Sequence, residues 1–403
     1  MRHRWPVLAA VLGSVLAVTA TVTGLPDRTE AAAPLRLLTD ASWRPPLPAG
    51  AVSDEAWLAQ GTVPGADGPW GPTVRQALLD LRGLSQANGA VEAAPAGIWR
   101  YAWPRDSAFA AVALSATGHR DDALATLGFL AEVQLDDGGF EARYRLDGAG
   151  PPDDRRRQAD GAGWALWALG EVVADAPDAA TARAELAPLE PLLDGATDFL
   201  LERSRDGRRL PEPSSDYWER PEADLTLGSA AAELAGLRAA AELWPVAGEA
   251  ARGRETGRAA QRLAGLVRAE FGPGGYQRYA DGGGRDAAVT FLLPPFADTV
   301  DPAVLDALRR YETEARRPAG GLAPGAGWKS DGTSWTPETA LTAYALAASG
   351  QDADAARWLD WLAAHRTAWG SLPEKVRADG APAGPAPLGW TAASVVLAVD
   401  ALG

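Results

Sequence analysis

Hydrophobic positions recur with the period of an α-helix over most of the chain, and short β-branched runs that would mark strands are few. Gly118, Gly350 and Gly403 stand directly after such segments, where a glycine commonly ends a helix. The pattern therefore predicts an all-α chain. Its twelve expected helices cover residues 73–86, 106–116, 120–134, 160–174, 186–203, 224–243, 247–270, 285–293, 302–316, 337–349, 352–365 and 390–402.

The expected helices alternate between two kinds. One kind is apolar on all sides and rich in small residues, whereas the other carries charge on one face. Helices that are apolar all round belong inside a fold, and amphipathic helices belong outside. The apolar helices begin near residues 106, 160, 224, 285, 337 and 390.

Six helix pairs at intervals of about 50 to 65 residues favour a closed ring. The predicted fold is an (α/α)6 barrel with six inner and six outer helices. An open α-solenoid is the alternative, but it would need polar caps and a consensus shared between repeats. The sequence shows no such consensus.

The N-terminal segment has the layout of a secretory signal peptide. Residues 1–4 read MRHR, residues 5–25 carry no charge, and the small residues 31–33 follow. We expect residues 1–33 to direct export to the cell envelope or the medium, with no membrane contact after cleavage. An uncleaved N-terminal anchor is the alternative. Residues 34–72 are rich in Pro and Gly and predict an extended arm, which leaves residues 73–403 for the barrel.

Composition excludes several classes of function. The 403 residues include no Cys and 3 His, so neither a cysteine nucleophile nor a His- or Cys-based metal centre is expected, and no cofactor is implied. A formal net charge of −15 argues against binding nucleic acid. The 16 Trp are an unusually large number, and tryptophan either fills cores or stacks on flat ligands.

Carboxylates and tryptophans cluster in the segments that precede the six apolar helices, and in a ring these segments gather at one end. Carboxylates bind sugar hydroxyls and aromatic rings stack on the apolar face of a sugar, so this combination is typical of a carbohydrate site. Each aspartate alone is equally well explained as a helix N-cap. The candidate residues in these segments are Trp103, Arg105, Asp106, Asp160, Tyr217, Trp218, Glu219, Arg220, Asp286, Trp335, Glu374 and Trp390.

Two of these candidates form a natural catalytic pair. Glu219 and Glu374 precede the third and sixth apolar helices, so a six-membered ring places them across the cavity from each other. Glycoside hydrolysis with inversion uses two carboxylates about 6.5–9.5 Å apart, with a water between them. The alternative for each is an exposed ion pair with its neighbour, Arg220 or Lys375, of little energetic value.

Four blocks of the sequence resemble glycoside hydrolase family 15, which includes glucoamylases, glucodextranases and trehalases. They read WRYAWPRDSAF at 99–109, QADGAGWALWAL at 158–169, DYWER at 216–220, and LPE at 372–374 with PLGW at 387–390. The blocks occur in the family's order. The resemblance implies an (α/α)6 barrel and anomer-inverting, glucoamylase-like hydrolysis of α-glucosidic bonds in an oligosaccharide or α-glucan. We expect a monomer.

The resemblance also implies roles for individual residues. Glu219 matches the general acid and Glu374 the general base. Arg105 and Asp106 match the pair that grips the terminal sugar, in a subsite that Trp103 and Trp218 would line. Asp160, Asp286 and Trp390 match less diagnostic positions. We expect burial against Trp218 and Tyr217 to keep Glu219 protonated while Glu374 stays ionised.

Three departures from the family pattern bear on the substrate. Arg220 stands where glucoamylases have a second acid, as in some prokaryotic members. The segment before the fifth apolar helix lacks the family's Arg-Tyr, which leaves Lys329 as a stand-in. Residues 34–72 are too short for the β-sandwich domain of many prokaryotic members. A sugar-binding toroid without turnover, and another (α/α)6 enzyme such as a phosphorylase, a lyase or a trehalase-type hydrolase, therefore remain alternatives.

Overall fold

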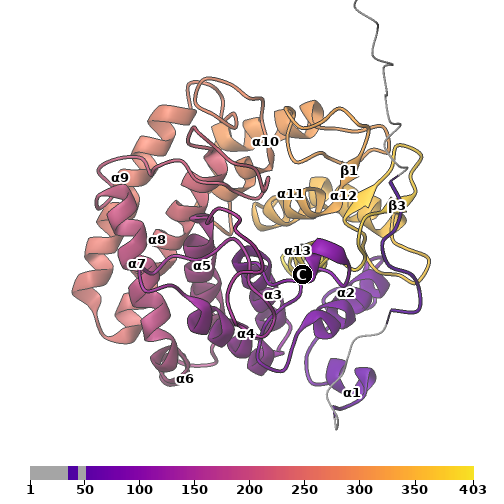
Figure 1. Ribbon diagram of the computed structural model, residues 1–403, viewed down its shortest axis with the longest axis horizontal. Helices are drawn as coiled ribbons and strands as arrows, with labels where there is room; N and C mark the ends of the chain where they lie inside the picture. The colour runs from indigo at the N-terminus through magenta and orange to yellow at the C-terminus, as the bar shows by residue number, and fades with distance from the viewer. Residues whose placement is uncertain (1–34, 44–50) are drawn as a thin grey trace, which may run out of the picture. The chain divides into compact units, whose positions relative to one another are not determined.

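The computed structural model describes residues 35–43 and 51–403 of the chain. The expected signal segment, residues 1–33, lies outside the described residues. Within the unit formed by residues 35–403, helices alternate between an inner and an outer ring (Figure 1). The inner ring consists of α3 (Pro104–Ala116), α5 (Asp160–Ala174), α8 (Leu227–Ala247), the 3-10 helix η3 (Ala287–Leu292), α11 (Thr336–Ala348) and α13 (Gly389–Asp400).

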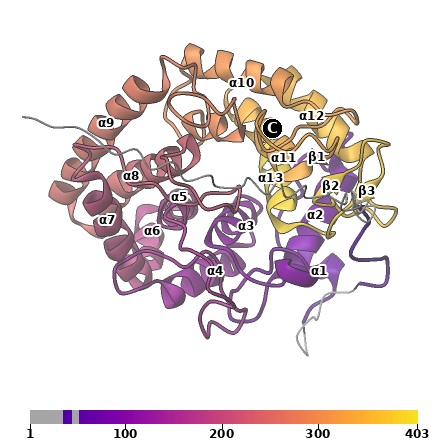
Figure 2. The ribbon, with the colours of Figure 1, turned by 45° about the horizontal axis from the view of Figure 1, so that its top comes forward.

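The outer helices pack on the inner ones, as the second view also shows (Figure 2). They are α2 (Gly71–Leu84), α4 (Arg120–Val133), α7 (Glu190–Ser204), α9 (Ala250–Phe271), α10 (Pro302–Glu314) and α12 (Asp352–Ala364). Each inner helix contacts the next, and α13 returns to α3, so the ring is closed. The predicted (α/α)6 barrel is confirmed.

The burial of each helix follows its sequence. Every residue of α13 except its last is buried, whereas α9 and α10 bury one face and expose a charged one. The inner helices α5 and α8 approach closely because glycines meet at the contact. A Cβ atom on Gly236 would lie 2.6 Å from the Cα of Gly163, a distance that no side chain tolerates.

The prediction of an α-helix over 285–293 was wrong. This position of the ring holds only the six residues of η3. Pro294 and Pro295 follow almost at once, and proline lacks the N–H that a continuing helix needs. Two short helices also escaped prediction: α1 (Asp54–Leu58) and α6 (Ala179–Leu186). The remaining elements are the 3-10 helices η1 (Gly97–Trp99) and η2 (Ala187–Leu189).

A small antiparallel sheet joins the segments that lead into the inner helices α11 and α13. Its strands are β1 (Ser334–Trp335), β2 (Lys375–Val376) and β3 (Pro382–Ala383), in the order β1-β2-β3. Residues 35–43 run beside this sheet, where the Leu38 N–H donates a 2.9 Å hydrogen bond to the Gly384 carbonyl. Across the described ranges, 35–43 and 51–403, no helix combines the length and apolarity that a membrane crossing requires.

Candidate active site

A cavity of about 330 Å³ opens at the N-terminal ends of the inner helices. Its walls come from the starts of α3, α11 and α13, from the turn before α8, and from the segment that follows α10. Nine of the twelve residues nominated from the sequence line it, which are Trp103, Arg105, Asp106, Tyr217, Trp218, Glu219, Trp335, Glu374 and Trp390. The ring therefore collects these residues at one end, as its topology predicts.

Glu219 sits in a tight turn that holds it in an unusual backbone conformation. Its φ of +55° lies in the left-handed region, which is costly for a residue other than glycine. The turn is closed by the Glu219 N–H, which donates to the Asp216 carbonyl at 2.8 Å. The Asp216 carboxylate accepts hydrogen bonds from the Trp218 N–H at 2.9 Å and from Arg278 at 3.0 Å. Arg278 also lies 3.8 Å from the Trp218 ring centre, so one buried arginine fixes the whole turn.

The surroundings of Glu219 differ from the sequence expectation. Its side chain is 26% exposed, and its two oxygens accept hydrogen bonds from Arg105 at 3.0 Å and Arg155 at 2.6 Å. The side chain is thus partly exposed and paired with two guanidinium groups, where the sequence predicts burial against Trp218 and Tyr217. That Glu219 carries a proton in the reaction stays a prediction. The suggested Glu219–Arg220 surface pair is not formed.

Glu374 also lines the cavity and lies directly before β2. Its backbone is held on both sides, since its N–H donates to the Pro385 carbonyl at 2.9 Å and its carbonyl accepts from the Thr336 N–H at 3.0 Å. Burial raises the pKa of the Glu374 carboxyl, while the Lys375 ammonium, 3.0 Å away, and a hydrogen bond from Trp99 lower it. The pair with Lys375 thus forms, but in the buried cavity wall rather than on the surface.

Arg105 connects most of the acidic groups of the site. Its buried guanidinium lies 3.1 Å from Asp160, 3.0 Å from Glu219 and 3.8 Å from Asp106. Its plane lies over the Trp390 ring at 5.2 Å from the centroid. Burial raises the pKa of Asp106 to about 6, against the opposing effect of Arg105. Asp106 and Arg105 therefore form a fixed pair whose polar atoms face the cavity.

Tryptophans form much of the remaining wall, and Trp99 among them hydrogen-bonds Glu374. Within the described part of the chain, no protein group accepts a hydrogen bond from five buried indole nitrogens of the cavity, which belong to Trp103, Trp218, Trp328, Trp335 and Trp390. Buried donors of this kind are normally satisfied. A ligand with many hydroxyl oxygens would satisfy them and stack on the rings.

Three nominated residues do not line the cavity. Asp160 lies one layer behind it, where it accepts hydrogen bonds from Arg105 and, at 3.2 Å, from Trp164. Asp286 is the N-cap of η3, accepting from the Ala288 N–H at 3.1 Å and pairing with Arg278 at 2.8 Å. Arg220 is exposed, because the left-handed turn at Glu219 directs the chain away from the cavity. Lys329, suggested as a stand-in arginine, is also exposed and does not line it.

Several lining residues were not nominated from the sequence. They include Trp99, Arg155, Trp328, Glu338 and Lys375. Arg155 comes from the long segment between α4 and α5, which precedes the second inner helix by several residues. Glu338 is the third residue of α11, where its acidic side chain matched the ordinary preference of a helix start. Trp99 and Trp328 belong to the aromatic excess that pointed to this kind of site.

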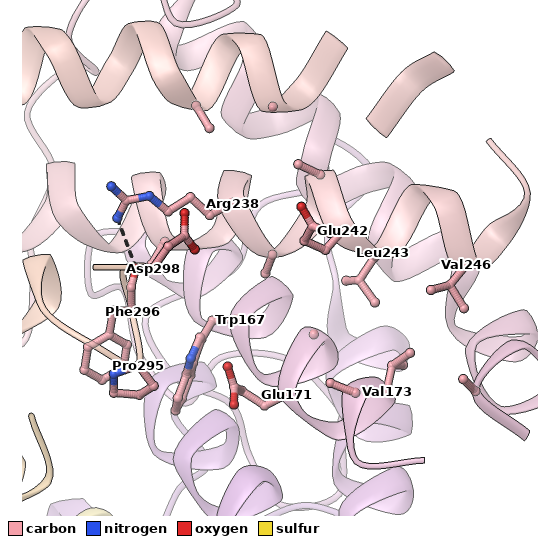
Figure 3. Close-up of a pocket in the computed structure, with 18 of the residues that line it drawn as sticks. Trp167, Glu171, Val173, Arg238, Glu242, Leu243, Val246, Pro295, Phe296 and Asp298 are labelled. Carbon is pink, nitrogen blue, oxygen red and sulfur yellow. Dashed lines mark hydrogen bonds between the residues drawn. The ribbon is translucent and has the colours of Figure 1, made fainter. Parts of the chain in front are cut away.

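A larger cavity, of about 690 Å³, lies elsewhere (Figure 3). It is bounded by the C-terminal halves of α5 and α8 and by the segment that follows η3. Arg238 there donates to the Phe296 carbonyl at 3.1 Å, and burial raises the pKa of Glu171 to about 7. None of the twelve nominated residues lines this cavity. We place the chemistry in the smaller cavity, where the opposed carboxylates lie.

Among the residues that the structure describes, no group of three or more His, Cys, Asp or Glu side chains comes together in a way that could hold a metal ion.

Comparison with known proteins gives a match by structure. No protein-family model matches the chain, and no curated protein matches it by sequence. Among solved structures, a glycosidase variant described as in complex with glucose has a TM-score of 0.71 at 23% identity, with 88% of this chain and 99% of that one covered. A bacterial glucoamylase complexed with acarbose has a TM-score of 0.70 at 20% identity, covering 86% of this chain and 57% of that one.

A third similar structure carries the family name. The glycoside hydrolase family 15 glucoamylase from Hypocrea jecorina has a TM-score of 0.62 at 16% identity, over 87% of this chain and 72% of that one. At sequence identities this low, the structural similarity shows the fold alone. The chain thus shares its (α/α)6 fold with family 15 glucoamylases, the family that its sequence blocks resemble.

Proposed function

We propose that the protein is a glycoside hydrolase that cleaves α-glucosidic bonds with inversion at the anomeric carbon. The observation that carries this proposal is the position of Glu219 and Glu374. They enter one tryptophan-walled cavity from the third and sixth inner positions of a six-membered ring. Two opposed carboxylates in a cavity of sugar-binding character are the minimum that this reaction requires.

In the proposed mechanism, Glu374 acts as the general base. Its ionised carboxylate, stabilised by Lys375, removes a proton from a water that attacks the anomeric carbon. Glu219 acts as the general acid and gives a proton to the glycosidic oxygen. Because both oxygens of Glu219 accept hydrogen bonds, from Arg105 and Arg155, at least one of these contacts must open before the glycosidic oxygen can reach the carboxyl group.

The bound sugar would be held by three kinds of group. Arg105 and Asp106 offer charged hydrogen-bonding partners for hydroxyls at the closed end of the cavity. Indole N–H groups without protein partners donate to sugar oxygens, and the ring faces accept the apolar side of the sugar. The glucose-bound glycosidase and the acarbose-bound glucoamylase of the same fold support a glucose-type ligand.

The test is a substrate screen with stereochemical detection. Maltose, isomaltose, trehalose, starch and dextran are incubated with the protein, and the first anomer released is identified by NMR. We expect the β-anomer of glucose from at least one α-linked substrate. Release of the α-anomer would contradict inversion. Sugar binding without product from any substrate would support the alternative of a carbohydrate-binding protein without turnover.

Export belongs to this proposal as a separate step. It is supported by the sequence of residues 1–33. N-terminal sequencing of protein recovered outside the cytoplasm tests it: a mature chain that begins after this segment is expected, whereas a full-length chain retained in the cell would contradict it.

A further inference from the structure

A third glutamate lines the cavity, and the reaction proposed above does not use it. Glu338 is the third residue of α11, and 3% of its surface is exposed. The ionisable groups near enough to interact with it are Arg105 from α3, Glu374 and Lys375 from the β2 region, and Tyr311 from α10. A carboxyl group in this position can contact whatever fills the cavity.

The Glu338 carboxyl has an incomplete set of partners. No protein group in the described ranges hydrogen-bonds its buried Oε2 atom. Burial raises the pKa of Glu338 to about 8, helped by the charge of Glu374 and opposed by its own backbone N–H, Arg105 and Lys375. The group is therefore an uncharged carboxylic acid at neutral pH, and an uncharged acid carries one hydroxyl donor.

A structural role does not account for this arrangement. A glutamate at the third position of a helix stabilises it by bonding back to the N-cap, usually with a Ser or Thr there. The N-cap of α11 is Trp335, whose side chain makes no capping hydrogen bond. A buried polar atom without a partner costs about 1–3 kcal/mol, so an apolar side chain would serve the fold better.

We propose that Glu338 is a sugar-binding residue whose protonated carboxyl donates a hydrogen bond to a hydroxyl oxygen of the sugar in the cavity. This inference rests on the proposed function, since it needs a sugar at the same site. Glu338 would then hold the sugar from the side of α11, while Arg105 and Asp106 hold it from the side of α3.

Two substitutions separate hydrogen bonding from shape. Glu338→Gln keeps the size and a donor, and it cannot ionise. Glu338→Met keeps the length and removes the donor. Binding of glucose to the intact chain is measured by titration calorimetry and by tryptophan fluorescence, with melting temperature and circular dichroism as checks on folding. We expect Glu338→Gln to bind glucose within about threefold of the wild type and Glu338→Met to bind about tenfold more weakly, as for one lost hydrogen bond.

The pH dependence of binding gives a readout that a merely structural role would not move. Above pH 8 the wild-type acid loses its proton, and with it the donor. Glucose binding by the wild type should therefore weaken there, whereas binding by Glu338→Gln should stay level over the same range. This comparison still decides the matter if Glu338→Met fails to fold.

Each other result contradicts the proposal in a recognisable way. If Glu338→Met binds glucose as well as the wild type does, the role of Glu338 is refuted while the sugar site stands. The same holds if binding by the wild type and by Glu338→Gln shows the same pH dependence. If Glu338→Gln folds normally but binds as weakly as Glu338→Met, hydrogen-bond donation is refuted. If the wild type binds none of the sugars of the substrate screen, the proposed function fails and this inference fails with it.

Discussion

The Arg155 guanidinium donates a 2.6 Å hydrogen bond to Oε2 of Glu219, and both residues line the cavity. Arg155 is partly exposed and comes from the segment between α4 and α5, whereas the second partner, Arg105, is buried in the cavity wall. We therefore expect the contact to Arg155, rather than the one to Arg105, to open when a sugar binds. The Arg155 contact occupies an oxygen of the group that is proposed to donate a proton.

The substitution Arg155→Met tests this relationship. Without Arg155, Oε2 of Glu219 has no hydrogen bond that must open before a glycosidic oxygen can reach it, so kcat/KM should rise. Arg220→Met is the matched control, because Arg220 adjoins Glu219 in sequence but is exposed and does not line the cavity. A kcat/KM that changes equally in both variants, or in neither, would refute the assignment.

Glu219→Gln and Glu374→Gln should each lower kcat by about 100-fold or more, since general acid and general base catalysis contribute roughly 10²–10⁴ each. Glutamine keeps the size of either side chain but neither gives nor takes the required proton. The comparison is with Glu212→Gln on the exposed surface, which should leave kcat unchanged. Full activity in either cavity variant would overturn the mechanism.

Lys375→Met tests the acidic limb of the pH profile. The general base must be ionised, so activity is lost as pH falls through the pKa of Glu374, which burial raises and Lys375 lowers. Removing the ammonium should raise that pKa further and move the acidic limb of kcat/KM to higher pH. The alkaline limb should not move. A shift of the acidic limb to lower pH would contradict the role of Glu374 as the base.

Asp106→Asn tests the sugar-binding pair. The pKa of Asp106 is raised to about 6 in the fold, above its usual 3.8, so the ionised group lowers the free energy of unfolding as pH rises through this interval. At pH 7 the asparagine should leave the melting temperature equal or slightly higher. Glucose affinity should fall about tenfold or more, as for a lost charged hydrogen bond. A large loss of stability with normal affinity would show a structural role instead.

Gly236→Ala tests the close approach of α5 and α8. The added methyl would lie 2.6 Å from the Cα of Gly163, and overpacking of this kind costs roughly 1–3 kcal/mol. The matched control is Gly265→Ala in α9, where no atom lies within 4 Å and alanine favours the helix by about 1 kcal/mol. The melting temperature should fall for the first and rise for the second. A melting temperature that falls for neither would contradict the packing argument.

The ring could be predicted from sequence because inner and outer helices need different surfaces. Helices α3 and α13 are apolar on all sides and have no face suited to water, so each is expected in the inner ring. The fourth inner position was mispredicted because its apolar residues fit either a helix or a buried extended segment. Pro294 and Pro295 were the signal that stops it, and they stand near the end of an otherwise helical pattern.

The sequence predicts those site residues whose place follows from the order of the helices. It does not predict those whose place depends on the course of a loop. Arg105 at the start of α3, and Glu374 on the segment that leads into α13, reach the cavity because the segments that enter the inner helices meet at that end of the ring. Arg155 reaches it by the course of a long loop, which no periodicity reveals. Asp286 has the same kind of position as Arg105, but it caps η3 and pairs with Arg278, and so faces away.

The packing of α13 on α3 has a consequence for biosynthesis. Helix α3 leaves the ribosome about 285 residues before α13, which packs on it, since the two helices begin at residues 104 and 389. Until then, the flank of α3 that faces α13 has no partner, and Trp390 is absent from the guanidinium of Arg105. The cavity that both residues line is therefore completed only when the last helix docks. A chain that stops before residue 389 would lack Trp390 in the cavity wall.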